Sequence, residues 1–262
     1  MSSHFESIGL RLPDAKALVD FVGKNWSRFQ EELRGDDTRH LRWTDPSGAS
    51  LAVHEQRGEV VCLTPFFDPP EGPSRWTVRS NAPREDEECV HCGGADVDVL
   101  VDGEMVTRST VQWLQFMPYR KWLRSSREYS LTVVGFTEKL ILYPDEAAFD
   151  RGPQLEGLGS LRLAVSSFLP FGMFEAAGLG VPGGVPAPVG VRRAARASIS
   201  GRISKANRRE NTQGTAFWHL RVDSLPGQLD VVAPLEALDG PPPAGAIALL
   251  DAWLVARPVD LP

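Results

Sequence analysis

The chain has 262 residues, of which 42% are hydrophobic and 24% are charged, a composition typical of globular proteins rather than disordered, fibrous or membrane-embedded ones. Its net charge of −6 argues against a dedicated binder of duplex DNA, because neutralising phosphates needs basic side chains. No apolar run approaches the roughly 20 residues that cross a bilayer, and the opening MSSHFE lacks the blocks of a signal peptide. We therefore expect a cytoplasmic protein with no membrane partner, and three cysteines suit a reducing compartment.

A stretch without charged residues, AAGLGVPGGVPAPVGV at residues 176–191, divides the sequence. Glycine and proline make poor interiors for helices and strands, so this composition predicts a linker. It separates an acidic α+β domain over residues 1–175 from a slightly basic, all-β domain over residues 192–262.

The first 67 residues predict the order strand, helix, strand, strand, strand. Apolar residues alternate over Phe5–Leu12, as in a half-buried strand. Pro13 and Asp14 then open a helix whose apolar residues recur at steps of three and four as far as Leu33. Three short apolar runs follow, and we expect them to be strands at residues 40–44, 50–55 and 59–67, with a turn at Asp45–Gly48 between the first two.

This βαβββ order, together with His4 and the DPSG turn, resembles the module of the vicinal oxygen chelate family, which includes glyoxalases and bleomycin-resistance proteins. The resemblance implies a metal ligand at His4. Ala52 stands where the family has its carboxylate. Convergence of His4 with Glu6, His40 and His54 across a sheet would offer another ligand set.

The rest of the first domain predicts a divergent second βαβββ half that lacks its helix. We expect strands over residues 75–79, 94–102 and 105–116, a hairpin of residues 129–136 with 139–143, and one helical turn at 145–150.

The second domain predicts four strands, over residues 197–205, 216–224, 228–233 and 247–257, with a helical turn at 235–238. This order resembles a small OB-like barrel, a five-stranded Greek-key sheet closed on itself. To close it, the last run would have to bend at Asp251 or pair with two neighbours. The two-domain arrangement is similar to that of bacterial proteins that join such an N-terminal unit to an OB-like tail, a resemblance that implies no activity.

The sequence ECVHCGG at residues 88–94 contains a candidate metal site. Cys89 and Cys92 are spaced so that two thiolates can share a tetrahedral zinc ion, and His91 lies between them. Cys62, His54 or His40 would have to complete the ligand set. A redox pair and ordinary loop thiols are the alternatives, so zinc is the one cofactor that the sequence suggests.

Residues 192–209 contain seven basic side chains and no acidic one. On an OB-like domain they could form a groove for single-stranded nucleic acid, in which cations track phosphates and aromatic rings stack on bases. The solvated face of a strand is the alternative. The candidate residues are Arg202, Lys205, Arg208, Arg209 and Trp218.

No GxSxG elbow, Walker A motif or HExxH motif is present, and we assign no catalytic residue. We expect a two-domain binding or interaction protein without catalytic activity, whose partner is another protein or a small molecule. A metal-dependent enzyme similar to the vicinal oxygen chelate family and a protein that binds single-stranded nucleic acid are the alternatives.

Overall fold

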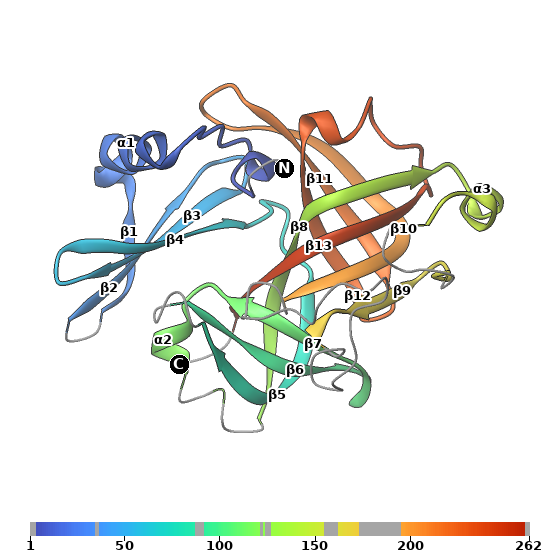
Figure 1. Ribbon diagram of the computed structural model, residues 1–262, viewed down its shortest axis with the longest axis horizontal. Coiled ribbons are helices and arrows are strands. Elements are labelled where there is room, and N and C mark those ends of the chain that lie inside the picture. The colour runs from blue at the N-terminus through green and yellow to red at the C-terminus, as the bar shows by residue number, and fades with distance from the viewer. Residues whose placement is uncertain are drawn as a thin grey trace.

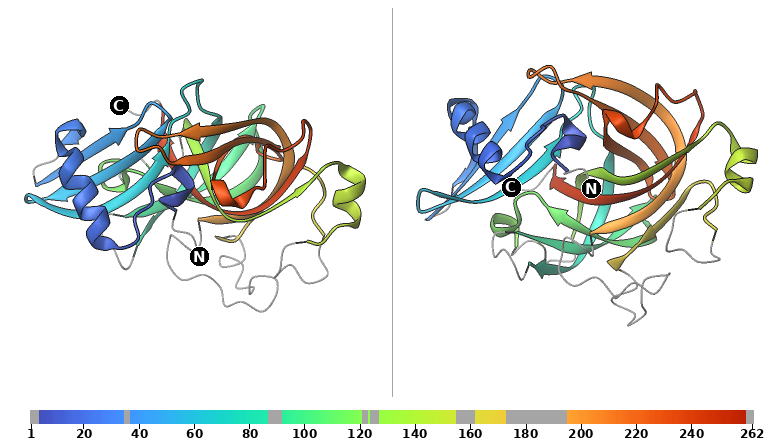
Figure 2. Two further views of the ribbon diagram at one scale, coloured as in Figure 1. Left: turned by 90° about the horizontal axis from the view of Figure 1, so that it is seen from above. Right: turned by 45° about the horizontal axis from the view of Figure 1, so that its top comes forward.

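The computed structural model describes residues 4–34, 37–86, 92–120, 123, 127–154, 162–172 and 195–259. It is a mixed α/β structure with few helices, in which most residues lie in strands of two sheets (Figures 1 and 2). Within these ranges no helix has the length and apolar character needed to cross a membrane. The predicted linker at residues 176–191 lies outside them.

The N-terminal part is a four-stranded antiparallel sheet in chain order, flanked by helices. Its elements are η1 (Glu6–Ile8), α1 (Ala15–Asn25), η2 (Trp26–Arg28), β1 (Gln30–Arg34), β2 (Thr38–Thr44), β3 (Ala49–Gln56) and β4 (Glu59–Phe67). Asp14 caps α1 by accepting a hydrogen bond from the backbone N–H of Ala17. Phe21 of α1 packs edge-on against Trp43. The helix thereby covers one face of the sheet.

Two expectations for this part are wrong. Phe5–Leu12 is not a strand, because Gly9 has a left-handed φ of 72° and closes the 3-10 turn of η1 by donating to the carbonyl of Glu6. The helix does not reach Leu33. It ends at Asn25, and β1 pairs with β2 instead. The order over residues 4–67 is therefore helix followed by four strands, rather than βαβββ.

The larger, nine-stranded sheet contains all the other strands that the structure describes. These are β5 (Arg75–Glu85), β6 (Gly93–Val101), β7 (Glu104–Trp113), β8 (Glu128–Tyr143), β9 (Ser167–Pro170), β10 (Arg196–Glu210), β11 (Ala216–Ser224), β12 (Gly227–Pro234) and β13 (Ile247–Pro258). Among the described residues, three short helices lie between these strands: α2 (Phe116–Tyr119), α3 (Glu146–Arg151) and η4 (Leu235–Ala237). The hairpin expected within residues 129–143 is wrong, because β8 is one continuous strand.

Two parts of this sheet follow the same pairing scheme. We call β5–β8 the first strand unit and β10–β13 the second strand unit. In each, three antiparallel strands are followed by a short helix and a long fourth strand that pairs antiparallel with the first strand of its own unit. The fourth strands also pair with each other, antiparallel and over most of their length.

Each fourth strand also crosses into the other unit. β8 pairs in parallel with β12, and β13 pairs in parallel with β7. The pairings therefore form two closed circuits, β5–β6–β7–β13–β8 and β10–β11–β12–β8–β13. Since β8 belongs to residues 1–175 and β10–β13 to residues 192–262, one sheet extends across the predicted domain boundary.

The two shared strands are buried on both faces, which explains their nearly continuous apolar sequence. Leu131 and Val133 of β8 belong to the core that fills both strand units, together with Leu254 of β13. The alternate residues Val134 and Trp253 belong to a second core, which also contains side chains of α1 and of β2–β4. The four-stranded sheet therefore packs on the outer face of the shared strands.

Candidate ligand-binding pocket

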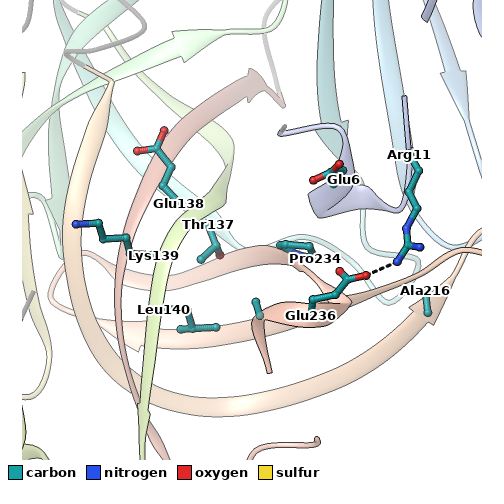
Figure 3. A pocket seen from close by; sticks show the side chains of 10 residues that line it. Glu6, Arg11, Thr137, Glu138, Lys139, Leu140, Ala216, Pro234 and Glu236 are labelled. Atoms are coloured by element: carbon teal, nitrogen blue, oxygen red, sulfur yellow. Dashed lines mark hydrogen bonds and ion pairs between the residues drawn. The ribbon is translucent and has the colours of Figure 1, made fainter. Parts of the chain in front are cut away.

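A cavity of about 730 Å³ lies where the N-terminal segment meets the second strand unit (Figure 3). Its walls are formed by η1, the middle of β8, the end of β12 and η4. The charged side chains that line it are Glu6, Arg11, Glu138, Lys139 and Glu236. This polar lining suits a hydrated or charged molecule better than an apolar one.

A bulge in β8 places Glu138 in this cavity. Thr137 lies opposite Ala252 of β13 and Lys139 lies opposite Asp251, so Glu138 is an extra residue without a partner in the register. A bulge bends the strand and redirects the side chain of its extra residue. Thr137 and Glu138, which lie between the two strands of the expected hairpin, belong to this bulge instead.

Two basic groups hold Glu138. Its carboxylate accepts a hydrogen bond from Arg196 at 2.6 Å and lies 3.2 Å from Nε2 of His4, whose ring stacks on Trp253. Burial raises the pKa of Glu138, but the hydrogen bond with His4 and the charge of Arg196 outweigh burial and lower it below its ordinary value. Glu138 is therefore ionised at neutral pH, as one member of an ion pair with Arg196.

The opposite wall carries a second carboxylate, Glu6 of η1 (Figure 3). Within the described part of the chain it makes no ion pair or side-chain hydrogen bond. Beside it, Arg11 forms an ion pair with Glu236 of η4, with 61% and 66% of the two side chains exposed. An exposed pair of this kind contributes at most about 1 kcal/mol, so a ligand can displace it easily.

The predicted metal ligands are only partly described. Cys89 and His91 lie outside the described residues, whereas Cys92 and His4 both line a smaller cavity of about 180 Å³. Of the three residues that the sequence offered to complete the set, Cys62 is the one beside Cys92, with their Sγ atoms 2.8 Å apart. His40 and His54 instead pack against each other inside the four-stranded sheet. Among the described residues, no three His, Cys, Asp or Glu side chains are grouped to hold a metal ion.

The basic residues of β10 are paired with carboxylates. Lys205 and Arg209 both contact Glu71, from the segment between β4 and β5. Arg202 pairs with Glu146 at 2.9 Å, and Arg208 lies 3.6 Å from Glu210. Trp218 is 5% exposed and donates its indole N–H to the carbonyl of Leu235. These contacts bring the candidate nucleic-acid residues together with acids, and the aromatic ring lies in the interior.

A buried charged cluster in the second strand unit was missed by the sequence analysis. Asp230, fully buried in β12, accepts hydrogen bonds from His219 at 2.8 Å, from Arg221 at 3.0 Å and from the backbone N–H of Ser74 at 2.6 Å. Burial raises the pKa of Asp230, but these hydrogen bonds outweigh it and lower the pKa. The feature of the sequence that could have indicated this cluster is an acidic residue within the largely apolar strand Gly227–Pro234. The cluster anchors the segment that enters β5.

Comparison with known proteins gave no match: no protein-family model, no curated protein and no solved structure matches this chain. The case for a function therefore rests on the geometry of the pocket and of the strands around it.

Proposed function

We propose that the protein binds a small polar molecule that carries a cationic group, and that it does so without catalysing a reaction on it. One observation carries the proposal. Glu6 and Glu138, from two different elements, both line the 730 Å³ cavity, and Glu6 has no partner among the described residues. A ligand ammonium group between these walls would give Glu6 a charge-assisted hydrogen bond, which is stronger than a neutral one.

The remaining lining residues offer charged and hydrogen-bonding groups to a ligand. Among the described residues that line the cavity there is no Cys, Ser or His to act as nucleophile or base. The one hydroxyl, Thr137 Oγ1, donates to the carbonyl of Val232 at 2.9 Å. Lys139 adds a positive charge to the lining, which suits a ligand that also has a hydrogen-bond acceptor.

We further propose that each strand unit is OB-like, with its fifth strand supplied by the other unit. Each circuit consists of three antiparallel strands, a short helix and a fourth strand that returns to the first. A fifth strand, parallel to the third, closes the circuit. The cavity adjoins η4, the helix between the third and fourth strands of the second unit. The second unit therefore forms one wall of the pocket, and η1 and β8 form the others.

The alternatives have less support. The topology favours binding of single-stranded nucleic acid, but a polyanion would have to displace Glu71, Glu146 and Glu210 from the basic side chains of β10. A metal-dependent activity similar to the vicinal oxygen chelate family would need a ligand cluster. His4 instead contacts Glu138 and Trp253.

Thermal unfolding with spermidine, putrescine or citrate as the probe tests the proposal. We expect an amine to raise the Tm by about 5 °C near saturation and citrate to leave it unchanged. The Glu6→Gln variant should lose about tenfold in amine affinity, whereas Glu59→Gln, an exposed acid outside the cavity, should behave like the wild type. A shift with citrate alone, or with none of the three probes, would overturn the proposal.

A further inference from the structure

Cys62 and Cys92 come together from the two different sheets. Cys62 lies in β4 of the four-stranded sheet, and Cys92 directly precedes β6 of the nine-stranded sheet. Their Sγ atoms are 2.8 Å apart although 30 positions separate them in the chain. A disulfide places its Cβ atoms about 3.8 Å apart and its sulfur atoms about 2.05 Å apart, so a small adjustment of the side chains would bring this pair to bonding distance.

The backbone on both sides of the pair is held in place. Cys62 lies opposite His54 of β3, beside a bulge at which the register of β3 and β4 shifts. The carbonyl of Cys92 accepts a hydrogen bond from the backbone N–H of Asp86, just beyond β5. The two sulfur atoms are therefore positioned by two sheets rather than by one turn.

The pair is also accessible from outside. Both cysteines are half-buried and line the 180 Å³ cavity, together with His4, Asp86 and Trp253. A small thiol reagent can therefore reach them without unfolding of the chain. Exposed disulfides have higher reduction potentials than structural ones and are the labile, redox-sensitive ones.

We propose that Cys62 and Cys92 are a reversible disulfide site that ties the four-stranded sheet to the nine-stranded one. The oxidant is a small disulfide such as glutathione disulfide. The thiolate of one cysteine attacks a glutathione sulfur, which forms a mixed disulfide and releases one glutathione thiolate. The other cysteine's thiolate then attacks the protein sulfur of the mixed disulfide and displaces the second glutathione. Two protein thiols are oxidised, one glutathione disulfide is reduced, and the two protons pass to the released thiolates.

Oxidation would stabilise the fold, because a cross-link over this loop restricts the unfolded chain. The expected rise in Tm is about 5 to 15 °C for a protein of this size, and a thiol reductant should reverse it. This proposal does not depend on the ligand proposed above, because neither cysteine lines that cavity.

The test uses the whole purified chain in glutathione buffers of increasing oxidised fraction, followed by alkylation and peptide mass spectrometry without reduction. We expect a Cys62–Cys92 cross-link in the wild type and in Cys89→Ser, but not in Cys62→Ser or Cys92→Ser. A disulfide that contains Cys89, three alkylated cysteines at every ratio, or stoichiometric zinc that protects the thiols would overturn the proposal. If a variant fails to fold, the wild-type peptide map alone decides.

Discussion

The first and second strand units share a pairing scheme but differ inside. Val134 of β8 and Val255 of β13 lie on the same face, in the core shared with the four-stranded sheet, and their parallel partners are Asp230 in β12 and Gln112 in β7. Asp230 is fully buried, and Gln112 is 6% exposed. One unit therefore places a charge where the other places a neutral amide, whose oxygen accepts a hydrogen bond from Trp253. The shared topology therefore depends on the alternation of residues along the strands and on the pairing of β8 and β13 with strands of both units, and not on the charged cluster.

The charged cluster has a separate task in the second unit. Asp230 holds the backbone of Ser74, and Arg221 donates to the carbonyl of Gly72 at 2.7 Å. Glu71 contacts Lys205 and Arg209. The segment that leads from the four-stranded sheet into β5 is thus bound along its length by side chains of the second unit. Three predictions test this difference between the units.

The largest effect is expected at the buried acid. Asp230→Ala removes the acceptor for His219, Arg221 and Ser74. Because the largely buried guanidinium of Arg221 then lacks its carboxylate, the free energy of unfolding should fall by about 3 to 5 kcal/mol. Urea denaturation measures the change.

Asp98→Ala in the first unit is the matched control. Asp98 is 7% exposed and accepts from Asn81 and from Arg108, but 51% of the Arg108 side chain is exposed, so water can hydrate the guanidinium that is left behind. The loss of Asp98 should therefore reduce the free energy of unfolding by only about 1 kcal/mol. Equal losses at the two positions would show that the cluster has no special role.

The next largest effect on stability is expected at Gly201 of β10, where the backbone of β11 lies very close. A Cβ on Gly201 would lie 2.3 Å from the carbonyl oxygen of Asp223, so Gly201→Ala should destabilise by about 1 to 3 kcal/mol. A Cβ on Gly135 of β8 would lie 3.3 Å from Ala252, and Gly135→Ala should stay below about 1 kcal/mol. Thermal unfolding of both variants checks the order, and a reversal would mean that β10 and β11 are spaced differently.

The smallest effect is the dependence of stability on acid. Burial raises the pKa of Glu71, but hydrogen bonds from Lys205 and Arg209 outweigh it and lower the pKa to about 2. A lowered pKa adds stability above the ordinary value near 4.5, and this stability is lost as the pH falls toward about 2.

Glu71→Gln should therefore be less stable than the wild type near neutral pH and should lose less stability on acidification. Unfolding free energies between about pH 6 and pH 3 measure this slope. Parallel curves for the variant and the wild type would exclude the contribution of Glu71.

Most strands were predictable because their alternation is local. The bounds expected for β4 and β11 are confirmed, and β13 extends only one residue beyond its prediction. The exceptions depend on distant partners. Phe29 and Leu33 fit a helical period, but pairing with β2 makes the segment around Leu33 a strand. The period of apolar residues within one segment carries no information on which distant strand will pair with it.

The candidate site was the hardest part to predict. Glu138 reaches the cavity because a one-residue bulge against β13 redirects its side chain, whereas in the sequence Thr137 and Glu138 also fit a hairpin turn. His4 was predicted as a metal ligand from a resemblance, whereas its described contacts are with Glu138 and Trp253. The approach of Cys62 to Cys92 was one of three options in the sequence, and only the packing of the two sheets distinguishes them.

Because β8 and β13 each pair with strands of both units, the order in which the strands are synthesised limits when the large sheet can form. β13 is the last strand that the structure describes, and it contributes to both closed circuits through β7, β8 and β10. During synthesis, β5–β8 leave the ribosome long before their closing partner exists, and β7 must wait for Val255. Until then, apolar strand edges stay exposed, which favours aggregation. The large sheet therefore cannot be completed until β13 has been synthesised.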